Sequence, residues 1–368
     1  MSTFTIEMLP ARHGDALWVE YGDATLSRVI IDAGPIEAWP QVQEKLDTVP
    51  ADDKDVELLV VTHVDTDHIE GVVRMLAPQR RKWAIRPREI WFNGYKHMRP
   101  AETLDGKQGE YLSALIHLRA NDTWNKAFSG QAVKVDADEN APLPVVTLPG
   151  GMEITVLSPD DAKLDKMAKE WERNISKWRT DPGDLDAAWE KLAEDHRYHP
   201  DEGLVLGPKD ITAQLEAQLN GIDNSHANGS SIAFLATYAG KSCLFLADAH
   251  ADVVCASIRK LIPKDKKVLK VDAVKLAHHG SQNNITKEFM KLVDSKHFLF
   301  SSNGAKYNHP DAAAVQAVIL GARRTRMPIL WFNYKSDMTK KYARHKQHGV
   351  LFQTRYPETG TDGIKVSL

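Results

Sequence analysis

Short runs of apolar residues alternate with polar positions through the first and the last thirds of the chain. This two-residue period, interrupted by turn residues such as Gly22-Asp23, predicts β-strands. The expected strands are 4–9, 16–21, 29–32, 58–61 and 90–92 in the first part, and 231–238, 242–246, 273–276, 298–300 and 329–332 in the second. A hairpin is expected where 145–148 and 153–157 flank Gly150-Gly151.

Helical spacing appears at 69–76, between the later strands, and from 160 to about 219, where Lys, Glu, Ala and Trp dominate. We interpret 160–225 as a helical insertion, and we expect Trp171, Trp178 and Trp189 to pack it onto the core or a partner subunit, with ligand stacking as the alternative. Along the chain, a strand-rich part is followed by helices and then by a second strand-rich part. This order predicts an α+β fold in which two sheets pack face to face and helices cover them. We treat 1–368 as one domain.

Composition narrows the functional classes. A chain of 368 residues with 42% hydrophobic residues can bury one large core or two modest ones, and its formal charge of -3 gives no overall attraction to polyanions. Cys243 and Cys255 cannot complete a thiolate metal site and favour a reducing compartment. No window approaches the about 20 apolar residues of a membrane span. We expect a cytoplasmic protein without a membrane partner.

The candidate chemistry begins directly after the apolar run 58–61. Residues 62–68 contain His63, Asp65, Asp67 and His68, a density of imidazole and carboxylate that suits zinc, manganese or iron. The alternative is an acidic turn that caps a helix. Three further sites also follow strand candidates, and strand ends can converge at one edge of a sheet. These sites are Asp248, the pair His278-His279, and His309.

Taken together, these motifs resemble the metallo-β-lactamase-fold hydrolases. The usual loop of that superfamily is His-x-His-x-Asp-His, whereas Asp65 stands here for its second histidine. The resulting His-x-Asp-x-Asp-His form resembles the hydrolase domain of ComEC-type DNA-uptake proteins. Segments 13–16, 31–34, 228–231, 246–248, 278–281 and 308–310 match that branch as well.

The resemblance implies a four-layer αββα metallo-β-lactamase-like sandwich that binds one or two divalent ions at one edge. By transfer, His63 and Asp65 hold one ion, Asp67 and His68 hold a second, Asp248 bridges, and His279 completes the second site. Either member of the 278–279 pair can be that ligand. We favour His279, with His278 as a catalytic or supporting group, because adjacent residues of an extended backbone point in opposite directions.

Two departures bear on the metal. The superfamily commonly has another histidine before the bridging aspartate, but 228–231 reads Asn-Gly-Ser-Ser, so the first site is expected to be weaker unless His226 compensates. The carboxylate of Asp65 also hardens the site, which favours manganese or magnesium without excluding zinc.

The expected reaction is hydrolysis by a metal-activated water, with Asp67 orienting the water and His278 or His309 stabilising charge on the substrate. The first hypothesis is a phosphodiesterase or nuclease, with nucleic acid contacted by local basic groups. These groups are 80–82 with Arg86 and Arg88, 264–267, 323–326, and Lys340-Lys341 with Arg344. The second is hydrolysis of a small ester, thioester or lactone, with the insertion as a lid. The third is a metal-binding sensor or partner subunit of a bacterial defence system, with the insertion as a protein interface or a homo-oligomer contact.

Overall fold

The alternating runs of the N-terminal part form one large sheet. The computed structural model describes residues 2–98, 107–175, 183–198, 224–321, 327–343, 346–347 and 349–368. Within them this sheet has six strands, which are β20 (Ile364–Ser367), β1 (Thr3–Met8), β2 (Leu17–Gly22), β3 (Leu26–Ile31), β5 (Leu58–Val60) and β7 (Ile90–Trp91) in spatial order. Neighbours are antiparallel from β20 to β3 and parallel from β3 to β7.

A second sheet contains eight strands, counted over the same described residues. In spatial order they are β19 (Gln353–Arg355), β16 (Ile329–Phe332), β15 (His297–Phe300), β13 (Ala273–Lys275), β11 (Lys241–Phe245), β10 (Ala233–Tyr238), β9 (Glu153–Ser158) and β8 (Val145–Thr147). Strands β11 to β19 are parallel, and β8 to β11 are antiparallel. Three small ribbons pair β4 (Asp55–Val56) with β6 (Arg86–Pro87), β12 (Leu269–Lys270) with β14 (Val293–Asp294), and β17 (Lys346–Gln347) with β18 (Val350–Leu351).

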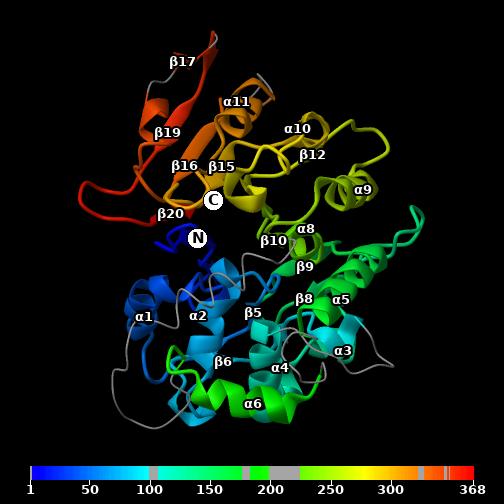
Figure 1. Cartoon of the computed structure of the whole chain (residues 1–368). Coiled ribbons are helices and arrows are strands. Elements are labelled where there is room, and N and C mark those ends of the chain that lie inside the picture. Colours follow the sequence, from blue (N-terminus) through cyan, green and yellow to red (C-terminus); the bar gives the residue numbers. More distant parts are fainter. Residues whose placement is uncertain are drawn as a thin grey trace.

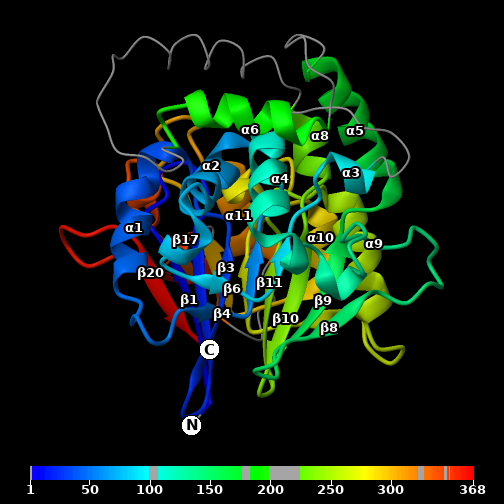
Figure 2. The same cartoon turned by 90° about the horizontal axis from the view of Figure 1, so that it is seen from below.

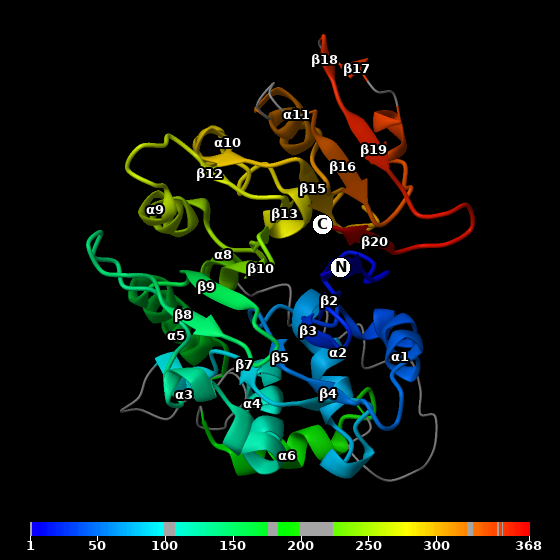
Figure 3. The ribbon, with the colours of Figure 1, turned by 180° about the vertical axis from the view of Figure 1, so that it is seen from behind.

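Helices cover the outer face of each sheet (Figures 1 and 3). Over the first sheet lie α1 (Trp39–Asp47), α2 (Thr66–Leu76), α3 (Tyr95–Met98), α4 (Lys107–Ala120), α5 (Asp161–Ile175), α6 (Leu185–Glu194) and α8 (Asn224–Gly229). Over the second lie α9 (Ala251–Leu261), α10 (Lys287–Leu292) and α11 (Ala312–Gly321). Short 3-10 turns are η1 (Ile36–Ala38), η2 (Arg80–Lys82), η3 (Asn121–Thr123), η4 (Lys126–Phe128), η6 (Ala277–Gly280) and η7 (Lys340–Tyr342).

The two-residue period explains the layers. In β2, Leu17 and Val19 face the second sheet, whereas Trp18 between them packs under the helices of the first. In β11, Phe245 faces the first sheet and Leu244 packs in the core that α9, α10 and α11 cover. Successive side chains of a strand point to opposite faces, so apolar residues on both faces bury both. The predicted α+β fold with four αββα layers is confirmed.

The predicted insertion, 160–225, contains α5, α6 and α8, and its parts 176–182 and 199–223, with Trp178, lie outside the described residues. Helix α6 packs on α4, and α5 packs on α3 and α8. Trp171 is buried in the core of this layer, as predicted, and Trp189 packs at its edge. Figure 2 shows α6 and α8 at the end of the sandwich opposite the N-terminus. In the described ranges, no helix is both long enough and apolar enough to cross a bilayer.

Candidate metal centre

The predicted donors lie in loops that follow strands at one edge of the sandwich. Residues 61–65 connect β5 to α2, whose first turn contains Asp67 and His68. Asp248 follows β11, and His278 and His279 follow β13. The backbone N–H of Ile232, next to β10, donates to the carbonyl of Thr62 at 2.9 Å and joins the two sheets at this edge. The structure therefore brings together side chains that are far apart in the sequence.

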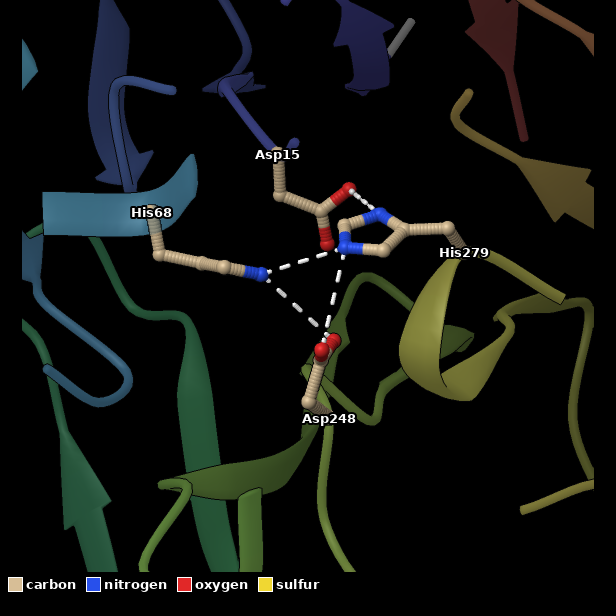
Figure 4. Close-up of side chains that lie close together, drawn as sticks. All are labelled: Asp15, His68, Asp248 and His279. Carbon is tan, nitrogen blue, oxygen red and sulfur yellow. Dashed lines mark hydrogen bonds and ion pairs between the residues drawn. The ribbon is translucent and has the colours of Figure 1, made fainter. Parts of the chain in front are cut away.

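One donor set is centred on two buried histidines (Figure 4). The Nε2 atoms of His68 and His279 are 3.2 Å apart, and Asp248 lies 3.5 Å from the first and 3.7 Å from the second. Asp67 Oδ2 lies 3.4 Å from His279 Nε2. Ligands about 2.0–2.1 Å from a tetrahedral ion are about 3.3 Å apart, so these spacings match a four-coordinate site.

A second donor set shares Asp248 with the first. His63 Nε2 is 3.5 Å from Asp65 Oδ2 and 4.0 Å from Asp248 Oδ2. His278 Nε2 approaches the same Asp248 oxygen at 3.7 Å. Asp248 therefore presents one carboxylate to both donor sets.

Hydrogen bonds to the far ring nitrogens aim the Nε2 atoms at these positions. His68 Nδ1–H donates to Asp32 Oδ2 at 2.8 Å, and Thr62 Oγ1–H donates to the same oxygen at 2.7 Å. Because the Thr62 proton is used there, its oxygen accepts from His63 Nδ1–H at 2.9 Å. A carboxylate or hydroxyl behind the ring in this way orients a metal-ligating imidazole.

Asp15 plays the corresponding part behind His279. One oxygen or nitrogen atom from each of Asp15, His68, Asp248 and His279 lies within 4.8 Å of the others. Asp15, however, approaches His279 at Nδ1, at 3.3 Å, and the Ser301 carbonyl accepts from the same nitrogen at 3.1 Å. Asp15 therefore orients His279 from behind, and His279 Nε2 faces Asp67 and Asp248.

His278 differs from the other three histidines. The side-chain amide of Asn228 donates to its Nδ1 at 3.3 Å, so the neutral ring carries its proton on Nε2 and directs it towards Asp248. The ring of His309 meets that of His278 edge to face, with 5.3 Å between centroids. His226, the alternative source of an imidazole, has its Nδ1 3.8 Å from Glu170 Oε2 on α5.

The residues present fit a divalent ion. His63 Nε2 and Asp248 Oδ1 are buried, and neither has a hydrogen-bond partner within the described part of the chain. Leaving a buried polar atom without a partner costs about 1–3 kcal/mol, and coordination of a cation removes that cost. The cluster of aspartates and histidines can therefore hold a metal ion.

The backbone around the cluster is strained. Asp32, Ala247, His278, His279 and Asn308 all have left-handed φ angles between 46° and 58°, a region that L-residues rarely adopt. Such strain concentrates at functional sites. It also corrects our argument for separating His278 from His279, because neither residue is extended and both rings reach Asp248.

Without a metal, the cluster is a network of imidazolium and carboxylate groups. Burial opposes charge on His68, but Asp248 and Asp32 outweigh it and raise the pKa of His68 well above 6.5. Burial likewise opposes charge on His279, yet Asp248 and Asp15 raise its pKa to about 9. Burial raises the pKa of Asp67, but the bond to His279 and the charge of His68 outweigh burial and hold it well below its ordinary value.

This network makes metal affinity depend on pH. A bound ion needs neutral rings, so each proton displaced from His68 or His279 raises the apparent affinity about tenfold per pH unit. We expect a tenfold to hundredfold rise per unit between pH 6.5 and about 9, measured by chelator competition. The folding stability of the metal-free protein should change with pH in the opposite direction to the metal affinity. Both folded-state pKa values exceed the unfolded value, so its stabilisation is complete below about pH 6.5 and falls as the pH rises to about 9. An affinity independent of pH would contradict the assignment.

Several of the basic residues singled out in the sequence pair with nearby carboxylates. Arg80 pairs with Asp122 at 3.1 Å, and Arg86 and Arg88 share Asp55. In the other groups, Lys266 pairs with Asp265 and Lys340 with Asp337. Residues 323–326 and Arg344 lie outside the described residues.

The comparisons with known proteins found similarity to solved structures only. No family model matches the sequence, and no curated protein matches it. The chain is similar to a HARLDQ-motif mutant of the metallo-β-lactamase of Cronobacter sakazakii, with a TM-score of 0.30 and 11% identity over 70% of each chain. It is also similar to a mutant of the CmlA β-hydroxylase, with a TM-score of 0.40 and 11% identity over 100% of this chain and 54% of that one. The chain thus spans about half of the latter protein.

Proposed function

We propose that this chain is a metal-dependent hydrolase, and specifically a phosphodiesterase. The observation that carries the proposal is the single Asp248 carboxylate placed between two donor sets. Two divalent ions that share this carboxylate would stabilise charge on the attacking and leaving oxygens of a displacement at phosphorus. The resemblance of the 63–68 motif to DNA-processing proteins supports the same choice of bond.

The donors divide unequally between the two positions. Asp67, His68, His279 and Asp248 would hold one ion in a four-donor set. His63, Asp65 and Asp248 would hold the other, and three protein donors leave positions open for substrate, as in catalytic sites. The mixed imidazole and carboxylate set suits zinc or manganese and also admits magnesium. When bound, the ions supply Lewis acidity and an activated water.

The other side chains of the site hold protons or stabilise charge on the substrate. The lowered pKa of Asp67 keeps it ionised, so it serves as a ligand and not as the acceptor of a proton. His278 presents its Nε2–H beside Asp248 and is placed to donate a hydrogen bond to an oxygen of the substrate. Burial, together with the neighbouring His278, lowers the pKa of His309 and keeps its ring neutral. His309 therefore packs against His278 without adding a positive charge beside it.

The test combines elemental analysis with a substrate screen. Protein loaded in turn with Zn²⁺, Mn²⁺ or Mg²⁺ is offered bis(4-nitrophenyl) phosphate, 4-nitrophenyl acetate, a thioester and a lactone. Turnover of the phosphodiester that disappears in Asp67→Ala and His68→Ala together supports the proposal. Turnover of the ester, thioester or lactone alone identifies the alternative hydrolase, and tightly bound metal without turnover identifies a sensor or partner subunit.

A further inference from the structure

A row of aromatic rings leads from the donor cluster to the surface. The ring of His278 contacts that of His279 on the inside and that of His309 on the outside. Tyr307 lies 6.1 Å beyond His309, and His13 lies 6.0 Å from Tyr307, with distances measured between ring centroids. His279 is fully buried, whereas Tyr307 at the outer end is 40% exposed. The row therefore runs from the buried donor cluster to the exposed ring of Tyr307.

A cation accompanies the exposed ring. Lys306 is exposed, and its Nζ lies 5.1 Å from the centroid of the Tyr307 ring. Burial raises the pKa of Tyr307, the charges of Asp67 and Asp65 add to burial, and together they outweigh the bond to Lys306, which lowers it. We call His13, Lys306, Tyr307 and His309 the rim.

The chemistry of the rim is complementary to a nucleotide. An exposed tyrosine face stacks on any planar base, and a neighbouring ammonium group attracts the phosphate attached to it. Binding of a phosphate without a base would require only the ammonium group of Lys306. Binding of an aliphatic ester would require neither Lys306 nor the ring of Tyr307. Arg80, Arg86 and Arg88 pair with carboxylates, so these three side chains do not extend the rim into a longer phosphate track.

We propose that the rim stacks a nucleobase next to the phosphodiester at the donor cluster, so that the substrate is a single-stranded nucleic acid. The inference rests on the proposed phosphodiesterase function and names its substrate class. Bases of a single strand can be splayed out onto an aromatic side chain, whereas each base of a duplex is covered on both faces. The rim therefore selects unpaired strands without selecting their sequence.

Binding measured without turnover tests the proposal. The probes are fluorescein-labelled phosphorothioate octathymidylate, an abasic phosphorothioate strand of equal length, and a duplex, added to Mn²⁺-loaded protein and followed by anisotropy. Stacking contributes about 1–3 kcal/mol per base, so Tyr307→Ala should weaken octathymidylate binding about 5- to 150-fold and leave the abasic strand unchanged. Tyr307→Phe should retain the affinity.

Two lysine variants separate stacking from charge. Lys306→Met should weaken both single strands by the same factor, because it removes attraction to phosphate alone. Lys335→Met is the matched control, since Lys335 is also exposed and lies 5.8 Å over the ring of Tyr356, and it should change neither affinity.

Several results would overturn the proposal. Equal affinity for the octathymidylate and abasic strands, unchanged in Tyr307→Ala, shows that no base is stacked. Tighter binding of the duplex, or no binding of any strand, excludes a single-strand site. In each case hydrolysis of bis(4-nitrophenyl) phosphate reports separately whether the phosphodiesterase proposal stands.

Discussion

Replacement of His68 by alanine is expected to remove bound divalent metal and to lower phosphodiester turnover roughly a thousandfold. His68 is fully buried, and its Nε2 lies 3.2 Å from that of His279 and 3.5 Å from Asp248. Without this imidazole, an ion held by Asp67, His279 and Asp248 would have one ligand fewer. Metal-ion catalysis provides several kcal/mol, and each 1.36 kcal/mol corresponds to about tenfold in rate.

The measurement is metal content per chain together with turnover at saturating metal. His117→Ala serves as the control, because His117 is an exposed histidine on α4. Asp32→Asn should give an intermediate result, about 10- to 100-fold weaker metal binding, because Asp32 contacts the far nitrogen of His68 and not the ion. A His68→Ala protein with full metal content and full turnover would refute the ligand set.

Strand positions were predictable wherever apolar and polar residues alternated locally. The runs 4–9, 16–21 and 153–157 correspond to β1, β2 and β9, because each strand buries a face against the opposite sheet. Strand β20 was not predicted. Its four residues carry little local signal, and they become a strand by pairing with β1 from the other end of the chain.

The candidate donors were predictable for a related reason, since each follows an apolar strand and histidine and aspartate are concentrated in residues 62–68. The supporting residues Asp15 and Asp32 had motifs but no assigned role. Their function depends on contact with His279 and His68, which sequence spacing does not reveal. The turn at 278–279 was likewise invisible, because left-handed φ angles in two successive histidines follow from the surrounding structure.

One residue carried a signal that sequence reasoning passed over. Lys275 ends the apolar strand β13 and is fully buried, and a lysine in such a run requires a partner. Its Nζ donates to Asp15 Oδ2 at 2.6 Å and to the carbonyl of Leu276 at 3.1 Å. Burial raises the pKa of Asp15, but Lys275 and His279 outweigh burial and hold it well below its ordinary value. Lys275 thus keeps charged the carboxylate that orients His279.

Substitution Lys275→Met is expected to lower the free energy of unfolding by up to about 3–5 kcal/mol, because it breaks a buried ion pair and leaves Asp15 with the His279 imidazolium as its remaining counter-ion. Urea denaturation of the metal-free protein at pH 7 measures the loss. Lys241→Met is the matched control. Lys241 pairs with Asp272 at 3.7 Å, but its side chain is 48% exposed, and exposed pairs contribute at most about 1 kcal/mol.

The paired variant Asp15→Asn with Lys275→Met distinguishes a missing charge partner from a packing defect. Removing both charges eliminates the buried carboxylate that has lost its lysine, so the double variant should be more stable than Lys275→Met alone. It should still bind metal less tightly than the native chain, because an amide orients His279 less well than a carboxylate does. If the double variant is instead less stable than Lys275→Met, the buried pair is not the source of the loss, and the methionine side chain fails to pack between the two sheets.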